Sequence, residues 1–147
     1  MAAGPWKLNQ YGKLKIGNAT INLNTGIFRL GLYQTGASAN IVGDISIQTS
    51  LGSEVAFGGA STYVVGGTTL SSSTWALSGS NGKFDSSDWI ITGSATNTIK
   101  YAYIVLSGGA TSGHLLCYST LSATAFALSG TNTLTIQMNV SGIFTLA

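Results

Sequence analysis

Short runs in which hydrophobic and polar residues alternate recur along the chain, each ending at a Gly, Ser or Asn turn. In the run IFRLGLYQ, Phe28, Leu30 and Leu32 occupy alternate positions. Arg29 and Tyr33 occupy positions between and after them. Because successive side chains of a strand point to opposite faces, this period of two predicts a strand with one face in the core.

The same alternation, with β-branched and aromatic residues, predicts further strands along the chain. They cover residues 19–24, 44–50, 74–78, 88–92, 98–107, 114–121 and 133–138. Gly66-Gly67 and Asn81-Gly82 are expected to form hairpin turns, since these residues tolerate positive φ. Residues 50–61 are expected to form a long loop or an irregular edge strand. About eight to eleven short strands at regular spacing are typical of a sandwich or barrel, so the sequence predicts an all-β fold.

Composition adds the expectation that other chains cover part of the surface. Of the 147 residues, 44% are hydrophobic and only 7% are charged, against roughly 25% charged in an average soluble domain. Such a surface must be neutral and rich in hydroxyl groups, or must be covered by neighbouring chains. A nearly uncharged monomer tends to associate, so we expect an oligomer or a permanent component of an assembly.

Charge, hydropathy and cysteine content exclude several classes of protein. The net charge of +2 is too small to indicate a nucleic-acid footprint. No run approaches the roughly 18 to 20 apolar residues of a membrane span, and the first ten residues lack a signal-peptide core. The single cysteine, Cys117, cannot form an intrachain disulfide and is expected to be a buried, inert thiol.

The first fifteen residues are distinctive in being basic. They contain Lys7, Lys13 and Lys15, which are three of the six cationic residues of the chain. A short basic arm of this kind could bind an acidic protein surface, or it could only keep a terminus solvated. We therefore divide the chain into an extended N-terminal arm, residues 1–15, and a single β domain, residues 16–147.

The sequence offers little for catalysis. His114 is the only side chain that titrates near neutral pH without a perturbed environment. No nucleophile-elbow pattern accompanies the serines, and one His with one Cys three residues away cannot complete a zinc site. The Gly pairs lack the helix and the Lys of a phosphate-binding loop. We expect no enzymatic activity, no catalytic residues, no metal and no cofactor.

The stretch KFDSSDWIITGSATNTIKYAYIVL, residues 83–106, contains two of the four acidic residues, Asp85 and Asp88. The simpler interpretation is a turn between strands, in which the carboxylates accept hydrogen bonds from backbone N–H groups. A calcium site would need more oxygen ligands than two carboxylates, although Ser86, Ser87 or backbone carbonyls could add them. Both interpretations remain open, and a hydrolase pair is disfavoured.

Aromatic residues raise one alternative, a platform that stacks against sugars. Its candidate residues are Trp6, Trp75, Trp89, Tyr33, Tyr101 and Tyr103. Tyr101 and Tyr103, however, lie in the β-branched run TIKYAYIVL, where one face of the strand is normally core. Since aromatic residues are enriched in strands for packing alone, we favour core or subunit contacts.

Several of these segments, in order, resemble a group of small virion proteins of tailed bacteriophages. KLKIGNATINLNTGIFRLGLYQ is similar to the opening of that group, and TYVVGGTTL is similar to its Tyr-x-x-Gly-Gly-x-x-Leu hairpin. KFDSSDWIITGSATNTIKYAYIVL resembles its central acidic and aromatic block. LLCYSTL and LTIQMNVSGIFTL resemble its last strands. The likeness covers nearly the whole chain through motifs that are structural in character.

The resemblance implies a virion structural protein without enzymatic activity. Its fold would be a jelly-roll β-sandwich, and its role that of a cement (decoration) protein on the capsid surface. The partners would be the major capsid protein and further copies of the chain in a homotrimer. The residues expected to contact the capsid are Trp6, Lys7, Leu8, Tyr11, Lys13 and Lys15. Alternatives are a tail or baseplate structural protein and a carbohydrate-binding β-sandwich module.

Overall fold

The structure, a computed structural model, describes residues 5–37, 53–57, 61–93, 97–107 and 113–146. Antiparallel strands account for most of the regular structure in these residues, so the predicted all-β class is confirmed. The strands are β1 (Lys7–Leu8), β2 (Ile27–Tyr33), β3 (Thr68–Thr69), β4 (Thr74–Ser78), β5 (Asn81–Asp85), β6 (Trp89–Thr92), β7 (Asn97–Ile99), β8 (Tyr101–Ser107), β9 (Leu115–Thr120), β10 (Phe126–Leu128), β11 (Thr133–Ile136) and β12 (Phe144–Leu146). The helical elements are α1 (Gln10–Gly17) and the 3₁₀ turn η1 (Thr35–Ala37).

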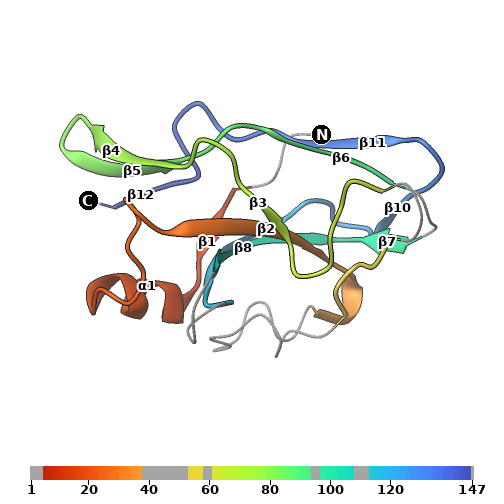
Figure 1. The fold of residues 1–147 in the computed structure, drawn as a ribbon, viewed down its shortest axis with the longest axis horizontal. Coiled ribbons are helices and arrows are strands. Elements are labelled where there is room, and N and C mark those ends of the chain that lie inside the picture. The colour runs from red at the N-terminus through yellow and green to blue at the C-terminus, as the bar shows by residue number, and fades with distance from the viewer. Residues whose placement is uncertain (1–4, 38–52, 58–60, 94–96, 108–112, 147) are drawn as a thin grey trace.

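The strands lie in two layers (Figure 1). The lower layer in that view is a five-stranded sheet with the order β1-β9-β8-β2-β3. The upper layer contains the three-stranded sheet β12-β5-β4 and the two-stranded sheet β11-β6. A further pair, β10-β7, lies at the end of the molecule opposite α1.

The main hydrophobic core contains residues from both layers. Phe28 of β2 meets Phe84 of β5 edge to face, with ring centroids 5.0 Å apart. Phe84 in turn stacks on Phe144 of β12 at 5.3 Å. As predicted from the alternation, Phe28, Leu30 and Leu32 are fully buried in this cluster. Burial of these side chains joins the five-stranded sheet to the three-stranded one.

The opposite face of the five-stranded sheet is buried as well. Tyr33, Tyr103, Val105 and Leu115 form a second cluster there, each at most 1% exposed. Gly31 pairs with Tyr103 across β2 and β8, and a Cβ added at Gly31 would collide with the Tyr103 ring. The absence of a side chain at Gly31 therefore leaves room for the large Tyr103 ring beside the neighbouring strand.

Most of the predicted strands are confirmed, and one is wrong. β2, β4, β6, β9 and β11 lie where the pattern places them, and the predicted strand at 98–107 belongs to β7 and β8, which Lys100 separates. Residues 19–24 form turns instead of a strand, although Ile21 and Leu23 are buried as expected. The strand predicted over 44–50 lies outside the described residues.

Asparagine side chains explain the failure at residues 19–24. The Asn18 Oδ1 accepts from both the backbone N–H and the hydroxyl of Thr20, at 3.2 and 2.7 Å. The Asn22 Oδ1 accepts from the backbone N–H groups of Asn24 and Thr25, at 2.9 and 3.2 Å. Side-chain oxygens thus take N–H groups that a strand ladder would need, and the backbone turns.

The predicted hairpin between residues 74 and 85 exists, but its turn residues are different. Ser78 pairs with Asn81, so the two-residue turn is Gly79-Ser80 and not Asn81-Gly82. Gly79 has a φ of 64°, which glycine adopts without steric cost. Asn81 and Gly82 instead begin β5, where Gly82 accommodates the Trp75 ring against its Cα.

Gly66 and Gly67 both have positive φ and form a turn, in which the Gly67 N–H donates to the Val64 carbonyl at 3.0 Å. The hairpin predicted through them is wrong, because residues 61–65 form no strand. The short strand β3 that follows the turn pairs with β2 instead.

Candidate functional site

The N-terminal segment is folded against the body and is not an extended arm over the described residues 5–15. β1 pairs with β9, placing Lys7 opposite Tyr118 and Leu8 opposite Cys117. The Asn9 N–H then donates to the Leu116 carbonyl at 3.0 Å. The arm boundary expected at residue 15 falls inside α1.

A cap and a glycine explain why the chain turns into α1 at this point. The Asn9 side chain accepts from the N–H groups of Tyr11 and Gly12, at 2.9 and 3.4 Å, and so satisfies the first free donors of the helix. A Cβ at Gly12 would collide with the Leu116 carbonyl oxygen. The absence of a side chain at Gly12 therefore allows the helix backbone to lie directly against β9.

The six residues that were expected to contact a capsid differ in exposure, because the N-terminal segment packs against the body of the protein. Trp6 and Leu8 are half-buried and pack against the main core, so they anchor the segment to its own body. Tyr11 and Lys15 are half-buried, and only Lys7 and Lys13 are exposed. The structure adds Leu14, whose side chain is 57% exposed on α1 beside Lys13.

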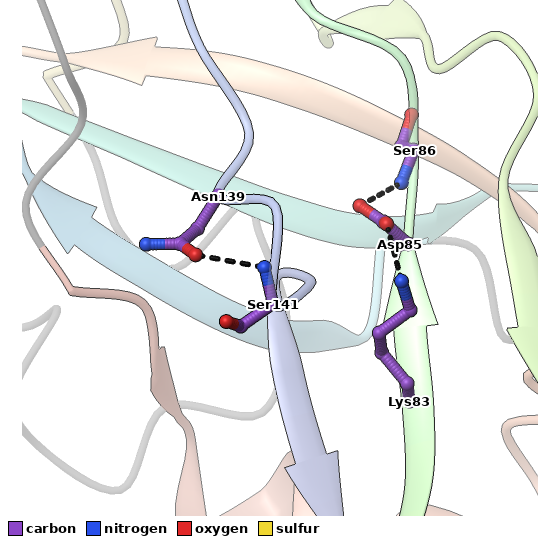
Figure 2. Close-up of polar contacts among 5 residues, drawn as sticks. All are labelled: Lys83, Asp85, Ser86, Asn139 and Ser141. Atoms are coloured by element: carbon purple, nitrogen blue, oxygen red, sulfur yellow. Dashed lines mark hydrogen bonds and ion pairs between the residues drawn. The ribbon is translucent and has the colours of Figure 1, made fainter. Parts of the chain in front are cut away.

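The two acids of the central stretch do not converge on one point. The Asp85 Oδ2 lies 3.1 Å from the Lys83 Nζ, and its Oδ1 accepts from the Ser86 N–H at 2.9 Å (Figure 2). The Asp88 Oδ1 accepts from the Met138 N–H at 2.8 Å, on a different segment. The prediction that these carboxylates accept backbone N–H bonds is confirmed.

The calcium alternative gains no support from this geometry. Within the described residues, no group of three or more His, Cys, Asp or Glu side chains is close enough to share a metal ion. Asp85 is already engaged by a cation and a backbone donor. The acidic pair therefore positions turns and segments of the chain.

The aromatic residues proposed as a sugar platform do not form one surface. Tyr33, Tyr101, Tyr103 and Trp89 are all at most 7% exposed. Trp75 is half-buried, with its ring against Gly82. The expectation of core packing is confirmed for the first four, and a continuous exposed platform of the six is excluded.

A partly buried polar network that sequence reasoning missed holds Glu54, Tyr63 and Gly66 against β2. The Tyr63 hydroxyl donates to the Glu54 Oε1 at 2.6 Å and accepts from the Leu32 N–H at 3.1 Å. The Gly66 N–H donates to the same Glu54 oxygen at 2.7 Å. One of the four acids of the chain thus supports the fold, since it satisfies donors that would otherwise be buried without a partner.

Burial dominates the ionisation of the two tyrosines nearest this network. It raises the pKa of Tyr63 far above its usual value, and the hydrogen bond to Glu54 raises that pKa further. Burial also raises the pKa of Tyr103, with neighbouring Tyr33 adding to the effect. Both phenols therefore stay neutral and act as hydrogen-bonding groups at ordinary pH.

His114 and Cys117 lie at or in β9 as inward-facing residues. Both are buried, and the His114 carbonyl accepts from the Leu106 N–H at 2.9 Å. Burial raises the pKa of the Cys117 thiol well above its usual value, which disfavours the reactive thiolate. The prediction of a buried thiol at Cys117 is confirmed.

The described surface contains a cleft of about 970 Å³. Its walls are Pro5 and Trp6 on one side, Asp88, and residues 137–145, which comprise the connection after β11 and the start of β12. Sequence reasoning missed this cleft because its walls come from three segments that are distant in the sequence. Of its lining, Asp88 was noted as a calcium candidate, and Trp6 was noted for the sugar platform and for capsid contact.

No helix in the part of the chain that the structure describes is long and apolar enough to cross a membrane. Comparison with known proteins found no family model, no curated protein and no solved structure that matches this chain. The function is therefore argued from the residues and their arrangement.

Proposed function

We propose that this chain is a non-enzymatic structural protein of a tailed-phage virion. In this proposal it is a cement protein that binds the outer capsid as a homotrimer and stabilises contacts between major capsid protein subunits. Its two layers of strands would form a jelly-roll sandwich. The proposal rests on the resemblance of the sequence motifs and on the nature of the surface.

The observation that carries the proposal is an exposed surface rich in uncharged and apolar groups. Large hydrophobic side chains that are more than half exposed are spread over several elements: Leu14, Ile27, Val64, Val65, Leu77, Ile90 and Val140. Only 7% of all residues are charged. A free monomer gains nothing from such exposure, whereas a subunit that is covered on several sides buries it.

The mechanism would be physical. A protein that binds the assembled lattice, but not free capsid subunits, stabilises the shell by mass action. Three copies joined in one trimer add avidity, so that no single contact has to be tight. A low charge makes such contacts insensitive to salt, because screening acts mainly on exposed charges.

Within the N-terminal segment, the capsid contact would be made by Lys7, Lys13 and Leu14. These side chains are exposed, whereas Trp6 and Leu8 pack against the core of their own chain. The docked helix α1 would present Lys13 and Leu14 on a fixed support. A fixed support reduces the entropy lost on binding relative to a flexible arm.

Copy number per particle tests the proposal directly. Quantitative mass analysis of purified virions should find several hundred copies, by order of magnitude, if one trimer covers each local three-fold position of an icosahedral shell. A copy number on the order of ten would instead indicate a tail or baseplate protein with hexameric or lower symmetry. Absence of the chain from purified particles would contradict both.

Point variants test the contact surface better than a truncation would. Deletion of residues 1–15 would remove β1 and most of α1 and would uncover β9. We expect Lys13→Glu and Leu14→Ser to weaken co-sedimentation with expanded empty shells by about tenfold or more, because each trimer loses three contacts at once. Lys100→Glu makes the same change of charge outside α1 and should bind normally. Full binding by the Lys13 and Leu14 variants would remove α1 from the contact.

A further inference from the structure

We propose that the cleft between the N-terminal segment and the β11–β12 connection binds a neutral saccharide. This binding site goes beyond the structural role proposed above and does not depend on it. The volume of about 970 Å³ lies at the upper end of the range of small-molecule sites. A space of this size accommodates several pyranose rings of an oligosaccharide.

The side chains that line the cleft have the hydrogen-bonding capacity that sugar hydroxyls require. Gln137, Asn139, Ser141 and Thr145 contribute amides and hydroxyls, and Asp88 contributes a carboxylate. Amides and carboxylates can each bond more than one hydroxyl group, because they present two polar atoms at a fixed spacing. Such pairs match the neighbouring hydroxyls of a sugar ring.

Two of these groups are held in place with part of their capacity unused. Asp88 is fixed through its Oδ1 to the Met138 N–H, and its Oδ2 bonds to none of the described residues. The Asn139 Oδ1 accepts from the Ser141 N–H at 2.8 Å. In Figure 2 the Asn139 amide nitrogen and the Ser141 hydroxyl extend to the same side of that turn, away from Asp85. Positions fixed before a ligand arrives reduce the entropy that binding costs.

The remaining walls suit the C–H faces of sugar rings. Trp6, Met138 and Val140 contribute apolar surface next to these polar groups, and the buried Ile143 and Phe144 lie behind them. A pyranose ring has C–H groups on its faces and hydroxyls at its edge, so a mixed wall serves both. Trp6 belongs to the N-terminal segment, and the pairing of β1 with β9 fixes that segment beside the cleft.

The charges of the lining restrict the ligand class. No described Lys, Arg or His lines the cleft. Among the described residues, a phosphate or another anion would therefore meet one charged group, Asp88, which has the same sign. An organic cation would contact Asp88 and Trp6, but it would form no hydrogen bonds with the four neutral polar side chains named above. A neutral polyol uses all of them.

Binding without hydrolysis follows from the same set of residues. Cleavage of a glycosidic bond usually needs two carboxylic groups across the bond. Among the described residues, Asp88 is the one acidic residue of the lining, and Asp85 is engaged by Lys83 and the Ser86 N–H. The cleft would hold a saccharide chain and leave it intact.

An extended peptide fits the cleft less well than a sugar. Peptides that add to a sheet edge bond to free main-chain groups. Along this wall, the N–H groups of Met138, Ser141, Gly142 and Ile143 already donate within the chain. The unused capacity belongs to side chains, which favours a ligand with many hydroxyls.

Titration of the whole chain with neutral oligosaccharides tests the proposal. Suitable probes are oligomers of glucose, galactose, mannose and N-acetylglucosamine at up to roughly 10 mM, which detects dissociation constants of about 1 mM. Saturation-transfer NMR reports binding, as does a change in tryptophan fluorescence, to which Trp6 contributes. We expect one class to bind saturably, and Gln137→Ala and Asp88→Asn to weaken it about five- to tenfold.

Matched controls make the same chemical changes outside the cleft. Gln10→Ala lies at the first residue of α1, and Asp85→Asn lies three residues from Asp88, and neither residue lines the cleft. Both should bind the probe normally. Asp88→Asn keeps an oxygen that can accept from the Met138 N–H, so its fold should survive, as thermal unfolding would verify.

Three outcomes would overturn the inference. They are the absence of saturable binding by any of the oligosaccharides, binding that both cleft variants leave unchanged, and preferential binding of uncharged peptides with the same sensitivity to these variants. None of them affects co-sedimentation with capsid shells. Failure of the saccharide site can therefore be distinguished from failure of the proposed structural role.

Discussion

Single buried polar groups control large parts of this structure because the chain has so few of them. Tyr63 and Glu54 together satisfy the N–H groups of Leu32 and Gly66 and so attach the segments around Glu54 and Tyr63 to β2. Glycines act in the opposite way, by leaving space. Gly31 admits the Tyr103 ring, and Gly12 admits the β9 backbone.

Removal of the Tyr63 hydroxyl should be costly. In Tyr63→Phe, the Leu32 N–H loses its acceptor and Glu54 loses a donor, while the ring and its packing remain. We expect a loss of about 1–3 kcal/mol in the free energy of unfolding, as measured by urea denaturation. Tyr11→Phe removes a hydroxyl from a half-buried tyrosine of α1 and should change that free energy by less than about 0.5 kcal/mol. Equal losses in the two variants would contradict the assigned network.

The same tyrosines should set the alkaline limit of stability. Their pKa values are raised in the folded chain, so the folded state holds these protons more tightly than the unfolded state does. The contribution of these phenols to the free energy of unfolding is therefore fully present below about pH 10, the ordinary tyrosine pKa. Above that pH the free energy of unfolding falls by up to about 1.4 kcal/mol per pH unit for each phenol.

Urea denaturation between pH 8 and pH 11.5 measures this slope, and Tyr63→Phe should reduce it. The absorbance of tyrosinate provides an independent readout. Ionisation of all six tyrosines near pH 10 in a chain that remains folded would show that Tyr63 and Tyr103 are not shielded.

At the scale of elements, strands with clear alternation were predictable and the segments between them were not. In β2, side chains at alternate positions determine both the strand and its buried face. Residues 19–24 have the same alternation, yet Asn18 and Asn22 bond to the local backbone and turn it. The turn predicted at Asn81-Gly82 is also misplaced. Gly79-Ser80, two positions earlier, forms the two-residue turn instead.

The helix α1 was missed because its local signals conflict. Asn9 is a good cap, whereas Gly12 and Gly17 disfavour a helix by roughly 1 kcal/mol each. Contact with β9 decides the outcome, and that contact cannot be read from local sequence. The cleft was missed for the same reason, because Trp6, Asp88 and Asn139 meet only in the folded chain.

Loss of the Asn9 cap should therefore release the helix. Asn9→Ala leaves the N–H groups of Tyr11 and Gly12 without their acceptor in a buried position. We expect a loss of about 1–2 kcal/mol in the free energy of unfolding. Hydrogen exchange should become faster in α1 before it does in β8. Asn9→Ser keeps a capping oxygen and should recover much of the loss, and an equal loss in both variants would argue against the cap.

At the scale of the molecule, one aromatic contact joins the two layers. Phe84 touches Phe28 of the five-stranded sheet and Phe144 of its own sheet. Its side chain is completely buried, so its loss would leave a cavity between the layers. The two layers are therefore expected to unfold together.

Phe84→Ala should lower the free energy of unfolding by about 3–5 kcal/mol and preserve a single transition. Far-UV circular dichroism follows all strands, and tryptophan fluorescence follows Trp6, Trp75 and Trp89. The two signals should change at the same urea concentration. Phe126→Ala, at a half-buried position on β10, should cost less. Separate transitions in the wild-type chain would show that the β4–β5 hairpin unfolds independently.

The pairing of β1 with β9 has a consequence for biosynthesis. Lys7 and Leu8 leave the ribosome early, but their partners Tyr118 and Cys117 are made much later. Until then, the edge of the sheet is incomplete and apolar side chains remain accessible to other nascent chains. Contacts between such distant residues slow folding, typically to milliseconds or seconds. High-level expression should therefore favour aggregation before completion of the sheet, and slower synthesis at lower temperature should raise the soluble yield.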